Sequence, residues 1–301
     1  MTVSSDCRPR GAPRPTFGLV GALLVVALVA SACQSSAPGA YQYKWYILFD
    51  SIFHPDGLII NGIWLTVSIA VVSQIIGVVL GILAALARLS SRAIPRWIAS
   101  IYIWLFRGTP LLVQISFIFY GLGVTKIYAW PDFVLNGTLI VSGAVQAGIC
   151  ALGVNEGAYM AEIVRAGIIS IDPGQAEAAK SLGMTYGQTM RRIILPQAAR
   201  VIVPPLGNEF NNMLKNTSLL VVIAVTELYV TFSNKNGSGS TSFHPLELFL
   251  AAAFWYLVLT TIWGFIQAWI ERRLGQGMGP GNDRITARQR LLGFRFGEKV
   301  E

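Results

Sequence analysis

Long apolar runs dominate this chain of 301 residues and limit the folds open to it. Four of them are as long as a membrane-spanning helix, which needs about 20 apolar residues. They are residues 58–87, 97–122, 138–160 and 246–270. With 53% hydrophobic and only 13% charged residues, the chain has more apolar surface than one water-soluble core needs. The sequence therefore predicts an all-α protein embedded in the lipid bilayer and crossing it several times.

A fifth segment, residues 206–229, is apolar only in its second half. Its first half carries Asn208, Glu209, Asn211, Asn212, Lys215 and Asn216. A charge at the centre of a membrane helix costs about 2.5–3.5 kcal/mol on insertion scales, so these residues should not face lipid. We expect the segment to line a protein interior or a watery path, and to bring the number of core helices to five.

The basic residues indicate one orientation for these helices. If residue 58 is outside, the cytoplasmic stretches 88–96 and 161–200, with everything after 271, hold fifteen Lys and Arg residues, whereas the external stretches hold three. Cytoplasmic loops of membrane proteins carry such an excess. The C-terminus, with its polar tail at 274–301, is thus predicted to be cytoplasmic. The net charge of +8 is explained by topology, and no nucleic-acid binding is expected.

The first 33 residues have the layout of a targeting segment. Three arginines precede an uncharged stretch at 17–30 and small residues that end at Cys33, as in a secretory signal. Residues 29–33 are also close to a bacterial lipoprotein cleavage box, which would make Cys33 a lipidation site. An uncleaved extra span and an upstream extension from a misjudged start codon are the alternatives. In every case residues 34–56 are expected outside the cell.

Metal, redox and catalytic sites have no support in the sequence. Cys7, Cys33 and Cys150 are far apart and show neither a disulfide framework nor metal-ligand spacing. No nucleophile, base and orienting group come together along the chain. A phosphate-binding loop of the GxxxxGKS or GxxxxGKT type is also missing from the sequence. We therefore expect no cofactor in this chain, and any ATP must be bound by another polypeptide.

The predicted cytoplasmic loop 161–200 encodes two short helices back to back. Residues 172–175 have the spacing of a capping box, and Gly183 stands where that helix would end. Residues 185–188 repeat the spacing, and the Leu-Pro pair at 195–196 closes the second helix. Two capped helices on a cytoplasmic face favour a docking element for another protein. An amphipathic pair resting on the membrane surface is the alternative.

A longer motif runs through the same loop without a gap. Its residues are Glu177, Ala178, Ala179, Gly183, Ile193, Leu195 and Pro196. This pattern resembles the EAA signature of bacterial ABC importer permeases. The segments 106–114, 158–165 and 215–219 are similar to the subfamily that serves histidine, glutamine, arginine and related polar amino acids. The resemblance covers residues 57–273.

The resemblance implies a type I importer transmembrane domain with the MetI-like fold, in the cytoplasmic membrane of a bacterium. Two permease subunits, identical or homologous, would form the path, each seating its loop on an ABC ATPase subunit. An extracytoplasmic amino-acid-binding protein would deliver the solute. Glu177 would make a polar contact at the seat, Ala178 and Ala179 would permit close approach, and Gly183 would allow the turn. The alternative for the two alanines is helix propensity alone.

Polar residues inside the predicted helices are the candidates for the solute path. They are Lys215, Asn216, Thr217, Ser218, Gln114 and Glu156. Lys215 could pair with the carboxylate of an amino acid, and a buried ion pair with Glu209 or Glu227 is the structural alternative. For Glu156 the alternative is a hydrogen bond within or between helices. Asn216 departs from the subfamily, which usually has Asp there, so a contact with the solute ammonium group would lose its charge.

The sequence Arg-Gly-Thr-Pro at 107–110 should break or kink the second helix, because proline removes a backbone donor. Arg107 and Pro110 are therefore candidates for a gate, with a packing role as the alternative. A competing function is an ion-coupled secondary transporter that works without an ATPase. Such proteins are built from internal repeats, and this sequence shows none. A membrane-embedded enzyme is a third possibility, without a catalytic constellation to support it.

Overall fold

The computed structural model describes residues 41–135, 137–237 and 239–275. The predictions for residues 1–33 and for nearly all of the polar tail lie outside these residues. From Lys44 onward the described residues form one compact unit, which is mostly helical as predicted. The elements, in chain order, are α2 (Trp45–Phe53), α3 (Gly57–Leu89), α4 (Ala93–Gly108), α5 (Leu111–Ser116), η1 (Phe117–Gly121), α6 (Leu122–Val124), β1 (Phe133–Leu135), β2 (Thr138–Val141), α7 (Gly143–Ile169), α8 (Pro173–Ser181), α9 (Tyr186–Thr189), η2 (Met190–Ile194), α10 (Leu195–Asn216), η3 (Thr217–Ile223), α11 (Leu228–Gly237), η4 (Gly239–Thr241) and α12 (Pro245–Gly275).

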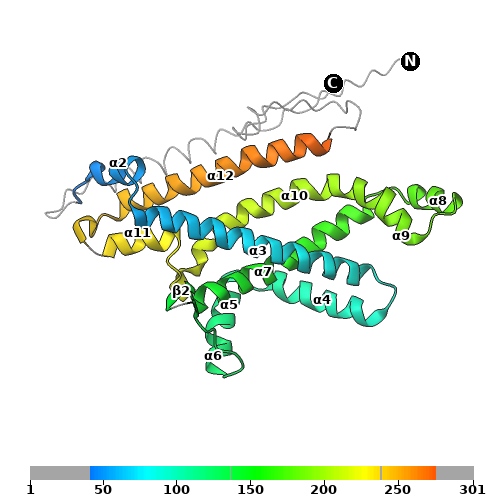
Figure 1. The fold of residues 1–301 in the computed structure, drawn as a ribbon, viewed down its shortest axis with the longest axis horizontal. Helices are drawn as coiled ribbons and strands as arrows, with labels where there is room; N and C mark the ends of the chain where they lie inside the picture. The colour runs from blue at the N-terminus through cyan, green and yellow to red at the C-terminus, as the bar shows by residue number, and fades with distance from the viewer. Residues whose placement is uncertain (1–40, 136, 238, 276–301) are drawn as a thin grey trace, which may run out of the picture. The chain divides into compact units, whose positions relative to one another are not determined.

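The helices α3 and α7 lie side by side in the middle of this unit (Figure 1). Glycines allow their backbones to approach closely. A Cβ atom added at Gly77 would lie 2.5 Å from Glu156 Cγ, and one added at Gly153 would lie 2.8 Å from Ile76 Cγ2. Small residues at a crossing are typical of packed membrane helices, which gain van der Waals contact where the backbones come together. The α3–α7 pair is therefore the centre of the unit, against which α4, α5, α10 and α11 pack.

Within the described residues, two helices are long and apolar enough to cross a membrane alone, Gly57–Leu89 and Pro245–Leu274. Two bent pairs qualify when each pair is taken together, Ala93–Gly108 with Leu111–Val124 and Tyr186–Ile223 with Leu228–Gly237. The total is thus two spans, or up to four if each bent pair is one. α7 has 27 residues but is less apolar, since it includes Asn155 and Glu156. The number of five core helices stays a prediction.

The predicted helix 97–122 is broken, as the proline at 110 indicated. α4 ends at Gly108, α5 begins at Leu111, and the two directions differ by 107°. Beyond α5, the π-helical turn η1 and the short α6 continue to Val124. The break leaves backbone carbonyls at the end of α4 without helical partners, and these groups need other donors.

The predicted helix 138–160 is wrong at its start. Residues 138–141 form strand β2, which pairs antiparallel with β1, and β-branched residues such as Val141 favour this extended form. Asp132 then accepts a hydrogen bond from the backbone N–H of Gly143 (2.7 Å), and Ser142 caps the new helix by accepting from Val145 (3.3 Å). α7 therefore begins at Gly143 and continues past the predicted end to Ile169.

The segment 206–229 does not form one helix either. α10 begins earlier, at Leu195, and passes at Asn216 into the tighter 3-10 turn η3. Ala224 then adopts a left-handed conformation with φ 56°, and its N–H donates to the carbonyl of Val221 (3.1 Å). This local closure ends the helical run, so α11 starts separately at Leu228 with a bend of 46°.

Candidate functional site

The loop with the Glu177 motif folds as two helical pieces at the end of the unit opposite α2 and α11 (Figure 1). Asp172 caps α8 by accepting from the N–H of Gly174 (2.8 Å), with Pro173 in the first helical position. The predicted reciprocal box at 172–175 is not formed, because the side-chain oxygen of Gln175 accepts a hydrogen bond from Gln197 Nε2 (3.5 Å) instead. The second box forms as predicted: Thr185 N donates to Gln188 Oε1 (2.9 Å), and Gln188 N donates to Thr185 Oγ1 (3.4 Å).

Gly183 ends the first of these helices in a left-handed conformation, with φ 77°. Its N–H donates to the carbonyl of Lys180 (2.9 Å), and the N–H of Met184 donates to Ala179 (3.1 Å). These two bonds form a complete Schellman motif, which satisfies the last carbonyls of the helix. A side chain at position 183 would meet no atom within 4 Å, so only the backbone conformation requires glycine here.

The tip of the loop presents apolar side chains to the outside. Leu182 is 83% exposed and Tyr186 is 80% exposed, on either side of the Gly183 turn. Glu177 and Ala178 are exposed on the same short helix, whereas Ala179 is buried. Large apolar side chains that project together from a polar loop are typical of a surface that another protein covers.

The predicted end of the second helix at Leu195-Pro196 is wrong. The π-helical turn η2 follows α9, and the N–H of Leu195 donates to the carbonyl of Met190, five residues earlier. Pro196 then falls in the first turn of α10, where its missing N–H leaves no bond unmade. Helical structure is therefore continuous from Tyr186 to Ile223. Ile193 is half-buried in the π-turn. The motif residues Leu195 and Pro196 therefore lie inside one long helical segment, residues 186–223, and not at the end of a short helix.

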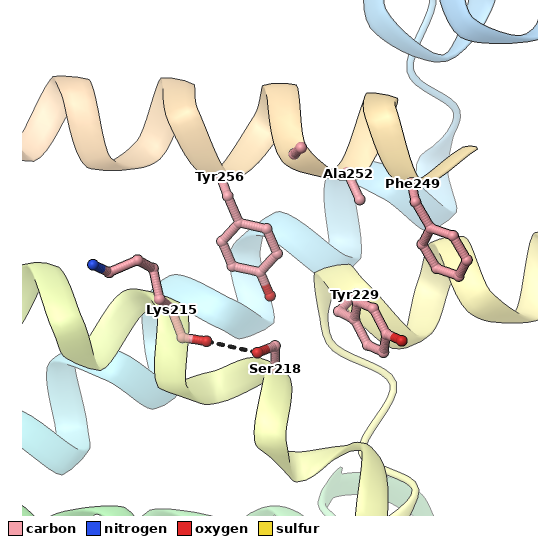
Figure 2. A pocket seen from close by; sticks show the side chains of 7 residues that line it. Lys215, Ser218, Tyr229, Phe249, Ala252 and Tyr256 are labelled. Atoms are coloured by element: carbon pink, nitrogen blue, oxygen red, sulfur yellow. Dashed lines mark hydrogen bonds between the residues drawn. The ribbon is translucent and has the colours of Figure 1, made fainter. Parts of the chain in front are cut away.

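The C-terminal end of this helical segment borders a cavity of ≈ 350 Å³ (Figure 2). Its walls include Lys215, Ser218, Tyr229, Phe249, Ala252 and Tyr256, from the α10–η3 junction, α11 and α12. The Ser218 hydroxyl donates to the carbonyl of Lys215 (2.7 Å), while the Lys215 ammonium group points away from the aromatic rings of Tyr229 and Phe249. The site thus offers one cation in an otherwise mostly apolar wall.

Lys215 is exposed and makes no ion pair with any described residue. Among the ion pairs of the described residues, none joins Lys215 to Glu209 and none joins it to Glu227. That carboxylate is buried and already accepts hydrogen bonds from Thr66 Oγ1 (3.2 Å), Tyr256 OH (2.6 Å) and the N–H of Val230 (3.0 Å). Sequence inspection could not find the bonds from Thr66 and Tyr256, because these donors lie 161 and 29 positions from Glu227 in the chain.

The residues that flank Lys215 differ in their availability. The Thr217 side chain is buried, and its hydroxyl donates to the carbonyl of Leu214 (2.9 Å). Asn216 is half-buried at the last position of α10. Ser218 borders the cavity, although its hydroxyl proton is engaged by the Lys215 carbonyl. Lys215 is therefore the candidate with the most freedom to meet a solute.

Gln114 is buried at the break between α4 and α5, away from the Lys215 cavity. Its amide donates to the carbonyls of Phe106 (2.8 Å) and Thr109 (3.0 Å), and its oxygen accepts from Asn155 Nδ2 (2.9 Å). These bonds satisfy carbonyls that the break at Pro110 left free. Asn155 was missed by sequence reasoning, although an Asn inside an apolar run beside Glu156 was a usable signal.

The two remaining candidates lie on the α7 side of the unit. Glu156 is buried and accepts a hydrogen bond from Gln74 Nε2 on α3 (3.1 Å), which is the interhelical bond given as its alternative. The Arg107 guanidinium lies 5.3 Å from the ring centroid of Tyr159 on α7. It therefore links the end of α4 to α7 by a cation–π contact.

Residues 77–276 match the protein family described as binding-protein-dependent transport system inner membrane component. The arginine transport system permease protein ArgU of Corynebacterium glutamicum is 40% identical over 90% of this chain and 83% of its own length. The L-cystine transport system permease protein TcyB of Bacillus subtilis is 40% identical over 71% of this chain and 85% of its own length. The chain belongs to this family of membrane permeases.

A solved structure leads to the same result. The crystal structure of an amino acid ABC transporter with histidines superimposes with a TM-score of 0.66 at 36% identity, over 77% of this chain and all of that chain. The predicted fold class is thereby confirmed, and the protein is a membrane-spanning permease subunit of an ABC importer. Nothing in these comparisons supports the ion-coupled secondary transporter.

Proposed function

We propose that this permease carries polar amino acids into the cell and that separate ABC ATPase subunits, docked on the loop 161–200, bind and hydrolyse the ATP. One observation carries the proposal: an unbroken helical run from Tyr186 to Ile223 joins the exposed loop tip to the cavity at Lys215. A packed rigid element of this kind can transmit a displacement from one end to the other. The cargo class rests on the arginine and L-cystine permeases that resemble the chain.

The loop residues have separate roles in this proposal. Glu177 makes a polar contact with the ATPase, and Ala178, exposed beside it, permits close approach. Ala179 is buried and packs within the loop, so helix packing is its role. Leu182 and Tyr186 supply the apolar part of the docking surface. The turn at Gly183 sets the angle between the two pieces.

The remaining partners and the topology complete the proposal. A second permease, identical or homologous, completes the path, and an extracytoplasmic binding protein delivers the solute. Glu177 and the C-terminus are cytoplasmic, whereas Lys235 is outside. Membrane-impermeant cysteine labelling of intact cells should reach position 235 and miss position 177. The opposite result would refute both the topology and the import direction.

The docking role is tested at Gly183. Gly183→Val forces a β-branched residue into a left-handed conformation, at a cost of about 1–3 kcal/mol. Gly187→Val is the matched control, since its side chain would also meet no atom within 4 Å but its backbone is helical. We expect Gly183→Val to reach the membrane in normal amount, to copurify poorly with the ATPase and to lose ATP-driven uptake. Normal uptake by Gly183→Val would refute the coupling role of this turn.

The solute contact is tested at Lys215. Because this side chain is exposed and unpaired with any described carboxylate, Lys215→Ala should leave assembly and ATPase copurification unchanged. Uptake of labelled arginine, glutamine or cystine should fall, and Lys215→Arg should restore part of it. Lys235→Ala serves as the control, since that residue pairs with Asp56 away from the cavity. Full uptake by Lys215→Ala would remove Lys215 from the path.

A further inference from the structure

The short helix α2, which precedes the first spanning helix, presents two opposite faces. One face packs on α12: Ile47 and Ser51 are buried there, and Trp255 Nε1 donates to the carbonyl of Ser51 (3.1 Å). The N–H of Lys44, at the start of the helix, donates to Glu247 Oε1 (2.7 Å). These contacts hold α2 against the beginning of α12. The opposite face of α2 therefore points away from α12.

The opposite face is aromatic. Tyr46, Phe49 and Phe53 are 63%, 54% and 71% exposed, and Trp45 is 47% exposed in the same row. The rings of Phe49 and Phe53, one helical turn apart, stack with their centroids 6.3 Å apart. No charged side chain interrupts this row. Four exposed aromatic residues on a nine-residue helix are unfavourable in water and call for an apolar environment.

The edge of the same helix is polar. Asp50 and His54 are one turn apart, with side chains 72% and 80% exposed and with Oδ1 and Nδ1 separated by 3.6 Å. Viewed along the helix axis, they lie between the aromatic row and the core-facing residues. The aromatic row of α2 therefore requires an apolar environment, and the neighbouring polar edge requires water.

The position of α2 in the unit supplies both environments. Three residues join its end to the start of α3 at Gly57, and it packs on α12 near Pro245. The two helices that can cross a membrane alone thus begin beside it. In a permease, this level is the boundary between lipid and water.

We propose that α2 is an interfacial helix whose aromatic face lies in the headgroup region of the outer leaflet, with Asp50 and His54 toward water. Tyr and Trp concentrate at this depth because their rings are apolar and their tips are polar. Amphipathic helices of this kind enter the headgroup–acyl boundary by about 5–10 Å. α2 holds the outer ends of α3 and α12 at a set depth. The choice of the outer leaflet rests on the topology proposed above, whereas the lipid contact itself needs only the membrane location and is independent of the cargo.

The test measures which medium surrounds each side chain. The full transporter, with Cys7, Cys33 and Cys150 replaced by serine, is reconstituted into phosphatidylcholine–phosphatidylglycerol vesicles. Spin labels are attached at Phe49→Cys and, as the matched control one residue away, at Asp50→Cys. The ratio of collisions with oxygen to collisions with a water-soluble nickel chelate should be several-fold higher at position 49 than at position 50.

Phe53→Cys provides a second member of the aromatic row and should behave like Phe49→Cys. Only preparations that retain ATP-driven uptake are measured, so a misfolded variant cannot imitate the result. Access of the nickel chelate to positions 49 and 53 would show a water-exposed face and overturn the proposal. Immobile labels that neither reagent reaches would show that protein, a second copy of the permease or another subunit, covers the face, and would equally overturn it.

Discussion

The helices α3 and α12 are the two that can cross a membrane alone, yet they are packed very differently. In their most apolar windows, 44% of α3 is buried inside the unit but only 11% of α12. α3 contacts α4, α7, α10 and α11, while α12 contacts α2, α10 and α11 (Figure 1). Hydropathy therefore identifies both as spans without telling which one forms the centre of the bundle.

The glycines of the two helices explain the difference. A Cβ atom at Gly77 or Gly81 of α3 would run into side chains of α7, whereas one at Gly264 of α12 would meet no atom within 4 Å. Lipid tails are as apolar as leucine side chains. A purely apolar helix surface therefore gains little free energy when it packs on protein instead of lipid. Close backbone approach at small residues decides which helices pair, and α12 stays at the edge.

The largest effect is expected at Gly81. A side chain there would overlap Met160 Cβ and lie 3.0 Å from the backbone nitrogen of Ala161, which cannot move aside. Gly81→Val should lower stability by about 3 kcal/mol or more and reduce the amount of folded permease. Gly264→Val should change neither. Equal thermal unfolding midpoints of the two variants in detergent would contradict the assignment of α3 to the packed core and of α12 to the edge of the bundle.

A smaller effect is expected where α12 is tied to the core. The Tyr256 hydroxyl donates to Glu227 Oε2 (2.6 Å), a carboxylate that also accepts from Thr66 on α3. Tyr256→Phe keeps the ring and removes only the donor, so it should cost about 1–2 kcal/mol in thermal unfolding.

Thr260→Val is the control for this tie. The Thr260 hydroxyl donates only to carbonyls of its own helix, those of Tyr256 (2.9 Å) and Leu257 (3.2 Å). Its loss should therefore leave the unfolding midpoint almost unchanged. If Thr260→Val destabilises the protein as much as Tyr256→Phe, the tie between α12 and the core is not carried by Glu227.

The smallest effect is expected at the water-exposed end of α3. Burial acts to raise the pKa of Asp56, but the ammonium group of Lys235 (2.5 Å) and the N–H of Ile59 outweigh it and hold that pKa below its ordinary value. A lowered pKa stabilises the fold above the unfolded value of about 3.9, and this contribution is lost as pH falls through the folded pKa.

Asp56→Asn tests this contribution, because it can still cap α3 while losing the charge. At neutral pH the variant should be less stable by under about 1 kcal/mol, since the pair is partly exposed. Toward about pH 3 the two proteins should converge. A difference in unfolding midpoint that does not shrink on acidification would show that the ion pair contributes nothing.

Features that depend on a few consecutive residues could be predicted from the sequence. Pro110 indicated the break in the second helix, Gly183 the left-handed helix end, and residues 185–188 the capping box, because turns and caps are closed by near neighbours. The motif around Glu177 identified the family for the same reason, as its spacing lies within one loop. The roles of its residues stay predictions.

Features that depend on contacts between distant segments were decided only by the tertiary structure. The continuation of the helix through Pro196 needed the π-turn at 190–194, and Gln114 found its partner in Asn155, forty-one positions away. The aromatic face of α2 has meaning only because Ile47 packs on α12. The sequence by itself determined the membrane class of the chain and local features such as the break at Pro110, the turn at Gly183 and the capping box at 185–188. The shape of the helix surfaces decided which helices pair. Apolar side chains alone do not distinguish one apolar partner from another, whereas small residues allow only certain backbones to come close together.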